Sequence, residues 1–249
     1  MIPQETFPKS LAALVLLGAL FLLTFPSLQW FGLFYTLCWV LPILLALVYL
    51  GKFEKEFYYW TVYPPKVKER FGRYTPLLLV TLGWLIAFLL FFPFVKEITT
   101  LAIVPPLLVA VATRVPMSIA LPTSAALHML VVAPSENNLF LGFAYNNLRK
   151  YLGYFAIFVI AAIAAFFHIN AYGLWNTPAL LASFLFFTIM AILIIVTQSQ
   201  LAPWTMHGSW NILVTVAEAK PELLNLAIIG TLIFSLLIGI VLMAVVKHD

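Results

Sequence analysis

The sequence predicts an all-α protein, a polytopic bundle of about eight membrane-spanning helices. Hydrophobic residues make up 64% of the 249 residues and charged residues only 9%, whereas soluble domains are about 45–50% apolar and about 25% charged. Mean hydropathy is +1.07. Apolar segments near the roughly 20 residues needed to cross the hydrocarbon recur along the chain. This composition excludes a water-soluble enzyme, a disordered chain and a coiled coil.

Charge and cysteine content exclude further classes. The formal net charge is +4, and no basic stripe interleaves with aromatic residues, so we expect no nucleic-acid partner. A single cysteine, Cys38, makes neither an internal disulfide nor a thiolate metal site. We interpret it as a small buried apolar residue.

The N-terminal part, residues 1–97, predicts three helices and one charged loop. The first helix, 9–25, stops at Pro26 and is expected to be retained rather than cleaved as a signal. The second covers 29–50. The loop 51–73 is the only strongly charged segment, and its basic residues are Lys52, Lys55, Lys66, Lys68, Arg70 and Arg73. The positive-inside rule therefore puts this loop and the N-terminus in the cytoplasm.

The rest of the chain predicts a helical core, 98–249, within a single membrane domain, 1–249. The third helix of the N-terminal part spans 74–94 and leads into this core. Residues 98–133 carry four prolines, which predict one crossing plus a bent or second short segment. Five apolar stretches follow, at 136–149, 151–168, 178–199, 202–217 and 223–246. An even number of crossings puts the C-terminus in the cytoplasm too.

Polar residues concentrate in the C-terminal half, where we expect the function. Ionisable groups inside a membrane are costly, so each is a candidate functional residue. Glu136 is the only carboxylate between Glu97 and Glu218, and three of the four histidines share that interval: His128, His168 and His207.

Glu136 follows Pro134 and Ser135. Ser135 is a plausible N-cap of a helix beginning here, with Glu136 in its first turn. The alternative interpretation is a water-exposed residue at the membrane interface.

His207 and Asn211 are four residues apart, which puts both on one face of a helix. His168 ends an apolar run, and His128 has no polar neighbour in sequence, so we interpret His128 as structural. A Glu–His pair can activate water as a general base. A histidine and an asparagine on one helix face can donate hydrogen bonds to an oxyanion.

Simpler interpretations compete with this one. His207 and Asn211 would also serve as a helix–helix hydrogen-bonding pair, and His168 as an interfacial histidine. A zinc site from one glutamate and two histidines is not favoured, because no His-Glu-x-x-His motif exists and asparagine is a poor zinc ligand. We therefore expect no cofactor.

These residues resemble the CPBP family, the CAAX-protease and bacteriocin-processing (Abi) membrane proteins. Its signatures are Glu-Glu-x-x-x-Arg, Phe-x-x-x-His and His-x-x-x-Asn. The third is intact as His207-Gly-Ser-Trp-Asn211. The second keeps His168 but has Ala164 for phenylalanine. The first begins at Glu136, with Asn137 for the second glutamate and Leu141 for the arginine, while Phe140 and Gly142 fit the pattern.

The resemblance implies about eight helices around an intramembrane active site that is reached from the cytoplasmic side. Glu136 and His168 would activate water, and His207 and Asn211 would hold the oxyanion. Asn137 and Phe140 would contact substrate. Without the arginine, Glu136 loses a salt-bridge partner.

The sequence thus predicts a glutamate-type intramembrane endopeptidase in a prokaryotic cell membrane. Its substrate would be a membrane-anchored protein or peptide, prenylated proteins included, and its environment the lipid bilayer. One alternative is a non-catalytic CPBP-like scaffold, immunity or assembly protein with a membrane-protein partner. A transporter or channel is a third possibility, although no internal repeat supports it.

Overall fold

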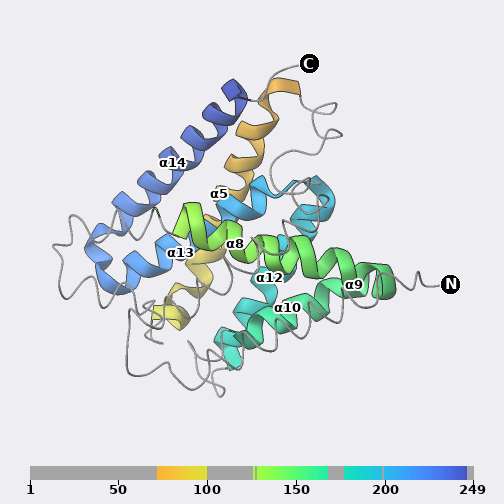
Figure 1. The fold of residues 1–249 in the computed structure, drawn as a ribbon. Helices are drawn as coiled ribbons and strands as arrows, with labels where there is room; N and C mark the ends of the chain where they lie inside the picture. Colours follow the sequence, from red (N-terminus) through yellow and green to blue (C-terminus); the bar gives the residue numbers. More distant parts are fainter. Residues whose placement is uncertain (1–71, 100–125, 127, 168–176, 198, 246–249) are drawn as a thin grey trace.

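A computed structural model of the chain describes residues 72–99, 126, 128–167, 177–197 and 199–245 (Figure 1). This part is almost entirely helical and contains no strand, as the sequence predicts. The expected helices 9–25 and 29–50 lie outside the described residues, as do almost all of the loop 51–73 and most of the segment 98–133.

Five long or medium helices frame the described part. They are α5 (Thr75–Thr99), α10 (Ala156–Phe167), α12 (Thr177–Thr197), α13 (Leu201–Ala219) and α14 (Leu224–Val245). Short 3₁₀ turns precede three of them: η1 (Gly72–Tyr74), η4 (Gly153–Phe155) and η5 (Pro221–Leu223). The expected helices 178–199, 202–217 and 223–246 agree with α12, α13 and α14 to within a few residues. The helix α5 was expected to end at Phe94, before Lys96 and Glu97. It instead continues through both charged residues to Thr99, five residues further.

Four helical segments of the described part are long and apolar enough to cross a membrane. They are Thr75–Phe92, Leu148–Phe166, Thr177–Thr197 and Pro221–Ala244. The more polar α13 is not among them. A total of about eight crossings stays a prediction.

One continuous helical run covers residues 128–152 and contains two π-helical segments. These are η2 (His128–Val132) and η3 (Asn138–Ala144), which flank α8 (Ala133–Asn137) and are followed by α9 (Tyr145–Leu152). The helical run therefore does not begin at Ser135, because η2 precedes α8 without a break. The α-helical geometry of α8 begins at Ala133, two residues before Ser135, and Glu136 lies in its first turn as expected. Proline has no N–H and its ring crowds the carbonyl four residues earlier, and the wider π turns of η2 just before Pro134 suit that requirement.

Close approach of backbones holds α5 to its neighbours. A Cβ added to Gly83 would lie 2.9 Å from the Ala202 carbonyl carbon, so α5 and α13 meet at this glycine. The Trp84 indole donates a hydrogen bond to Thr231 Oγ1 of α14 at 3.1 Å. Such small-residue contacts and interhelical hydrogen bonds are the usual means of helix association in membranes.

The helices α5 and α14 run antiparallel. Trp84 lies beside Thr231, while Leu77 lies beside Gly239, eight residues further along α14. The beginning of α5 and the end of α14 therefore lie at the same end of the bundle, at the top of Figure 1.

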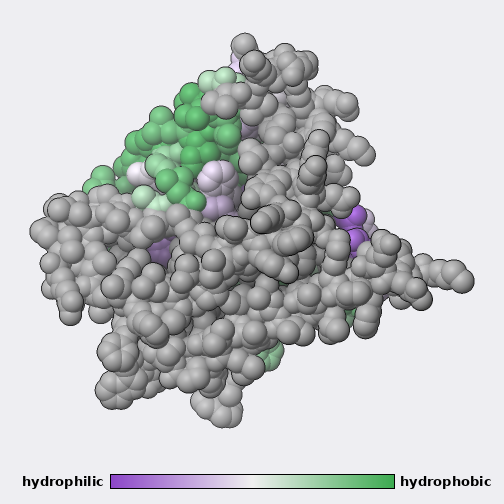
Figure 2. Space-filling model, viewed as in Figure 1, coloured by the Kyte–Doolittle hydropathy of each residue, from purple (hydrophilic) through white to green (hydrophobic). Residues whose placement is uncertain are grey.

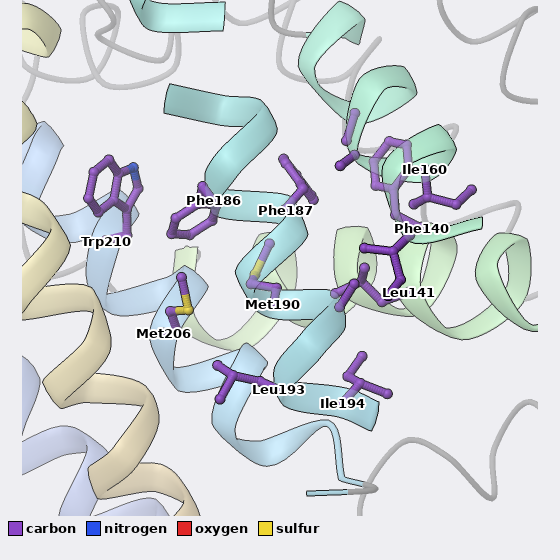
Figure 3. Packing of buried hydrophobic residues seen from close by; sticks show 14 of the residues in the cluster. Phe140, Leu141, Ile160, Phe186, Phe187, Met190, Leu193, Ile194, Met206 and Trp210 are labelled. Carbon is purple, nitrogen blue, oxygen red and sulfur yellow. The ribbon is translucent and has the colours of Figure 1, made fainter. Parts of the chain in front are cut away.

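The main core lies where α12 and α13 meet the run 128–152, α5 and α10 (Figure 3). Phe186, Phe187 and Met190 of α12 face Met206 and Trp210 of α13, and Phe140 and Leu141 approach from η3. The helix α10 contributes small buried residues, which allow close packing: Ala156, Ala161, Ala164 and Ala165.

The outward faces of α5 and α14 are apolar. About half of each large side chain is exposed along two stripes, which are Leu78, Leu85, Leu89 and Phe92 on α5, and Leu226, Ile229, Ile233, Leu237 and Ile240 on α14. Figure 2 shows a continuous hydrophobic surface where Figure 1 has α14. Contact with lipid accounts for such extended surfaces, and the chain is an integral membrane protein.

Candidate active site

Three predicted residues meet between α8 and α13. Glu136 and His207 are almost fully buried, at 4% and 2% exposure. His207 Nε2 lies 3.5 Å from Glu136 Oε2. On the other side of the same ring, Nδ1 lies 2.8 Å from Asn137 Oδ1. The imidazole is thus held between two consecutive residues of α8.

This geometry fixes where one proton of His207 lies. The amide oxygen of Asn137 only accepts hydrogen bonds, so His207 Nδ1 carries a proton and donates it. The other nitrogen, Nε2, faces Glu136 Oε2. A carboxyl group and an imidazole at this separation are suited to general acid–base chemistry.

Aromatic rings surround the rest of His207. Phe186 and Phe187 of α12 contact the imidazole edge-on, with centroids 5.5 and 5.8 Å away. Phe140 packs against Phe187 at 5.6 Å and is only 2% exposed. Phe140 therefore supports the wall of the site from the core, and a direct contact with substrate stays a prediction. This apolar surrounding strengthens electrostatic interactions inside the site.

A second polar pair lies beside the first. Asn211, one helical turn after His207 on α13, has its Nδ2 3.5 Å from His128 Nδ1. His128 is buried at the start of η2. The structure thus brings a histidine that the sequence analysis interpreted as structural into contact with a predicted oxyanion donor.

Contacts at Met129 hold η2 against α13. The indole N–H of Trp204 donates to the Met129 carbonyl oxygen. A Cβ added to Gly208 would lie 3.1 Å from Met129 Cα and would meet its sulfur as well. Because Trp204 and Gly208 flank His207, this contact sets the spacing between α13 and the run that carries His128 and Glu136.

The remaining predicted positions have different outcomes. His168 lies outside the described residues, and its role stays a prediction. Leu141, where the resemblance expects an arginine, is buried in the core, and so is Ala164, where it expects a phenylalanine. Within the described segments, no group of three histidine, cysteine, aspartate or glutamate side chains is arranged to hold a metal ion.

Sequence reasoning missed His128 because its partner comes from another helix. The π-helical segments also matter: His128 precedes Glu136 by eight residues, and the wider turns bring the two residues to a similar face, which an ordinary α-helix would not do as closely.

A scan against known families gives one finding. Residues 118–213 match the family described as Type II CAAX prenyl endopeptidase Rce1-like. No curated protein and no solved structure matches the chain. The matched segment includes the group formed by Glu136, Asn137 and His207 and the pair formed by His128 and Asn211. Over residues 118–213 the chain is therefore similar to the CAAX prenyl endopeptidases, and the resemblance seen in its motifs is confirmed.

Proposed function

We propose that this chain is an intramembrane endopeptidase of the glutamate type. The observation that carries the proposal is the buried Glu136 carboxyl group 3.5 Å from His207 Nε2. A carboxylate and an imidazole are rarely buried among aromatic residues without a chemical role. The similarity to CAAX prenyl endopeptidases supports a peptidase at the level of the family.

In the proposed reaction, Glu136 takes a proton from water while the oxygen attacks the carbonyl carbon of the scissile amide. The oxyanion that forms accepts hydrogen bonds from His207 Nε2–H and Asn211 Nδ2–H. Protonated Glu136 then gives its proton to the leaving nitrogen as the C–N bond breaks. His168 is proposed to assist Glu136 in activating the water.

Asn137 has two roles in this scheme. Its Oδ1 holds His207 so that Nε2 points at the reacting groups. Its Nδ2 is buried and has no hydrogen-bond partner among the described residues, which makes it a donor available to a substrate carbonyl group. A buried donor without a partner costs about 1–3 kcal/mol, so a ligand that accepts from it would gain affinity.

The proposed substrate is a membrane-anchored protein or peptide, prenylated proteins included. Apolar outer faces on α5 and α14 put the chain in the bilayer, where a lipid-anchored substrate reaches it by lateral diffusion. A non-catalytic scaffold is the second candidate, because buried Leu141 replaces the arginine expected beside Glu136.

The test compares protein termini in native membranes that carry the wild-type chain or Glu136→Gln at equal abundance. We expect termini that disappear in the variant, because glutamine cannot accept the proton from water. Glu222→Gln is the matched control, since Glu222 is an exposed carboxylate that pairs with Lys220 at 3.5 Å. It should leave every terminus unchanged.

Two outcomes would contradict the proposal. Termini that persist in Glu136→Gln would exclude Glu136 as the base. Identical termini in all strains, with the variant still restoring the cellular phenotype, would support the scaffold.

A further inference from the structure

We propose that His128 is a positioning residue that orients the carboxamide of Asn211 toward the reacting carbonyl oxygen. This inference rests on the proposed function. It adds to the site a residue that the motif pattern does not include.

The contact between the two side chains has a defined polarity. Asn211 Nδ2 lies 3.5 Å from His128 Nδ1. An amide NH₂ group only donates, so His128 Nδ1 accepts and the imidazole proton is on Nε2. In this tautomer, with the proton on Nε2, His128 accepts from the nitrogen end of the amide and offers nothing to its oxygen end.

This selection matters for catalysis because the two ends of a carboxamide have the same shape and opposite chemistry. With its oxygen turned toward the substrate, Asn211 would repel the developing oxyanion. An NH₂ group carries two hydrogens. One is used by His128, and the other stays available beside His207, whose Cβ on the same helix face is about 5–6 Å from that of Asn211.

The fold holds His128 in this position. It is the first residue of η2, and the next residue, Met129, is fixed to α13 by the Trp204 indole and by close contact with Gly208. His128 therefore positions the Asn211 side chain from a backbone that is itself held against α13. The two α13 residues that hold it, Trp204 and Gly208, lie on either side of His207 in the sequence.

The experiment measures kcat and KM of the purified full-length chain, in liposomes, on the substrate identified from the membrane termini. The variants are His128→Leu, His128→Gln, Asn211→Ala and the double variant His128→Leu/Asn211→Ala. Leucine removes the acceptor. Glutamine keeps one in Oε1. Leu130→Ala is the control, because Leu130 lies in the same turn and is exposed.

We expect His128→Leu to lower kcat by about 10–10²-fold with little change in KM, since a misdirected oxyanion donor is worth up to about 10²–10³. His128→Gln should recover most of that loss, and Leu130→Ala should behave as wild type. In the Asn211→Ala background, His128→Leu should have no further effect, because the two residues act as one unit.

Two results would overturn the inference. One is an equal loss of kcat from His128→Leu in the wild-type and Asn211→Ala backgrounds. The other is a His128→Gln variant that is as slow as His128→Leu while both unfold at the wild-type temperature. Failure of the proposed function would give different results: the wild-type chain would show no activity, or Glu136→Gln would be active.

The contact itself has a readout independent of cleavage. If the hydrogen bond exists, the unfolding-midpoint shift of the double variant should be smaller than the sum of the two single shifts. Additive shifts would show that the side chains do not interact, and this too would overturn the inference.

Discussion

At the scale of single residues, Asn137 keeps one hydrogen-bonding property of the glutamate that the resemblance expects at its position. A glutamate at this position would offer His207 an acceptor oxygen, and the asparagine offers one as well. The charge differs, and so does the second end of the side chain, because Nδ2 is a buried donor without a partner in the part of the chain that the structure describes. The substitution thus retains the orientation of His207 while changing what the site presents to a substrate.

Variants of Asn137 separate these two roles. Asn137→Leu leaves His207 Nδ1–H without an acceptor, so we expect kcat to fall by about 10²-fold as the ring is misplaced. It should also lose about 1–3 kcal/mol of unfolding free energy. Asn137→Asp keeps the acceptor and removes the donor, so it should retain more kcat than Asn137→Leu and raise KM. Steady-state kinetics and thermal unfolding check this, with Asn225→Leu on the exposed face of α14 as the control. Wild-type kcat in Asn137→Leu would exclude the orienting role.

Some residues of the site could be predicted from the sequence, and their contacts could not. Glu136, His207 and Asn211 stand out because they are polar residues among apolar ones, with a spacing of four between the last two. The pairing of His207 with Asn137, and of Asn211 with His128, depends on how α13 packs against the run 128–152. Tertiary contacts of that kind leave no periodic signal in one sequence.

At the scale of elements, long apolar stretches bounded by proline or charged residues predicted α12, α13 and α14 well. The run 128–152 was harder. Pro134 and Ser135 are typical of a helix N-terminus, yet both lie in α8, which continues the π-helical segment η2 without a break. Local capping signals mislead where packing against another helix holds the chain in a helical path.

A substitution at Gly208 tests whether the contact between η2 and α13 builds the site. In Gly208→Ala, the added Cβ would lie 3.1 Å from Met129 Cα, so η2 must move away. We expect a loss of about 1–3 kcal/mol in unfolding free energy from overpacking. Cleavage should fall too, because Glu136 and His128 withdraw from His207 and Asn211.

Gly230→Ala is the matched control for Gly208→Ala. No atom of the described residues lies within 4 Å of a Cβ added there, and alanine favours a helix over glycine by up to about 1 kcal/mol. The control should therefore be neutral or slightly stabilising. Equal behaviour of the two variants in unfolding and cleavage would show that the Gly208 contact is dispensable.

At the scale of the whole molecule, the antiparallel pair α5 and α14 relates the structure to the membrane. The beginning of α5 and the end of α14 share one end of the bundle. This agrees with the topology that charge alone predicts, in which the basic loop 51–73 and the C-terminus lie on the same side. The turn at Pro221–Leu223 between α13 and α14 then lies on the other side.

Labelling of single cysteines in intact cells tests this topology, in a background where Cys38 is replaced by serine. Tyr74 and Glu222 are both exposed and lie at opposite ends of the α5–α14 pair. A membrane-impermeant maleimide should react with Glu222→Cys from outside and with Tyr74→Cys only after permeabilisation, because the positive-inside rule predicts a cytoplasmic position for the six basic residues before Tyr74. The reverse pattern would invert the orientation while keeping the fold. Labelling of both positions from one side would mean that α5 and α14 do not both cross the bilayer. The lipid-facing role of their apolar stripes would then have to be abandoned, and with it the argument that substrates reach the Glu136 site by diffusion within the membrane.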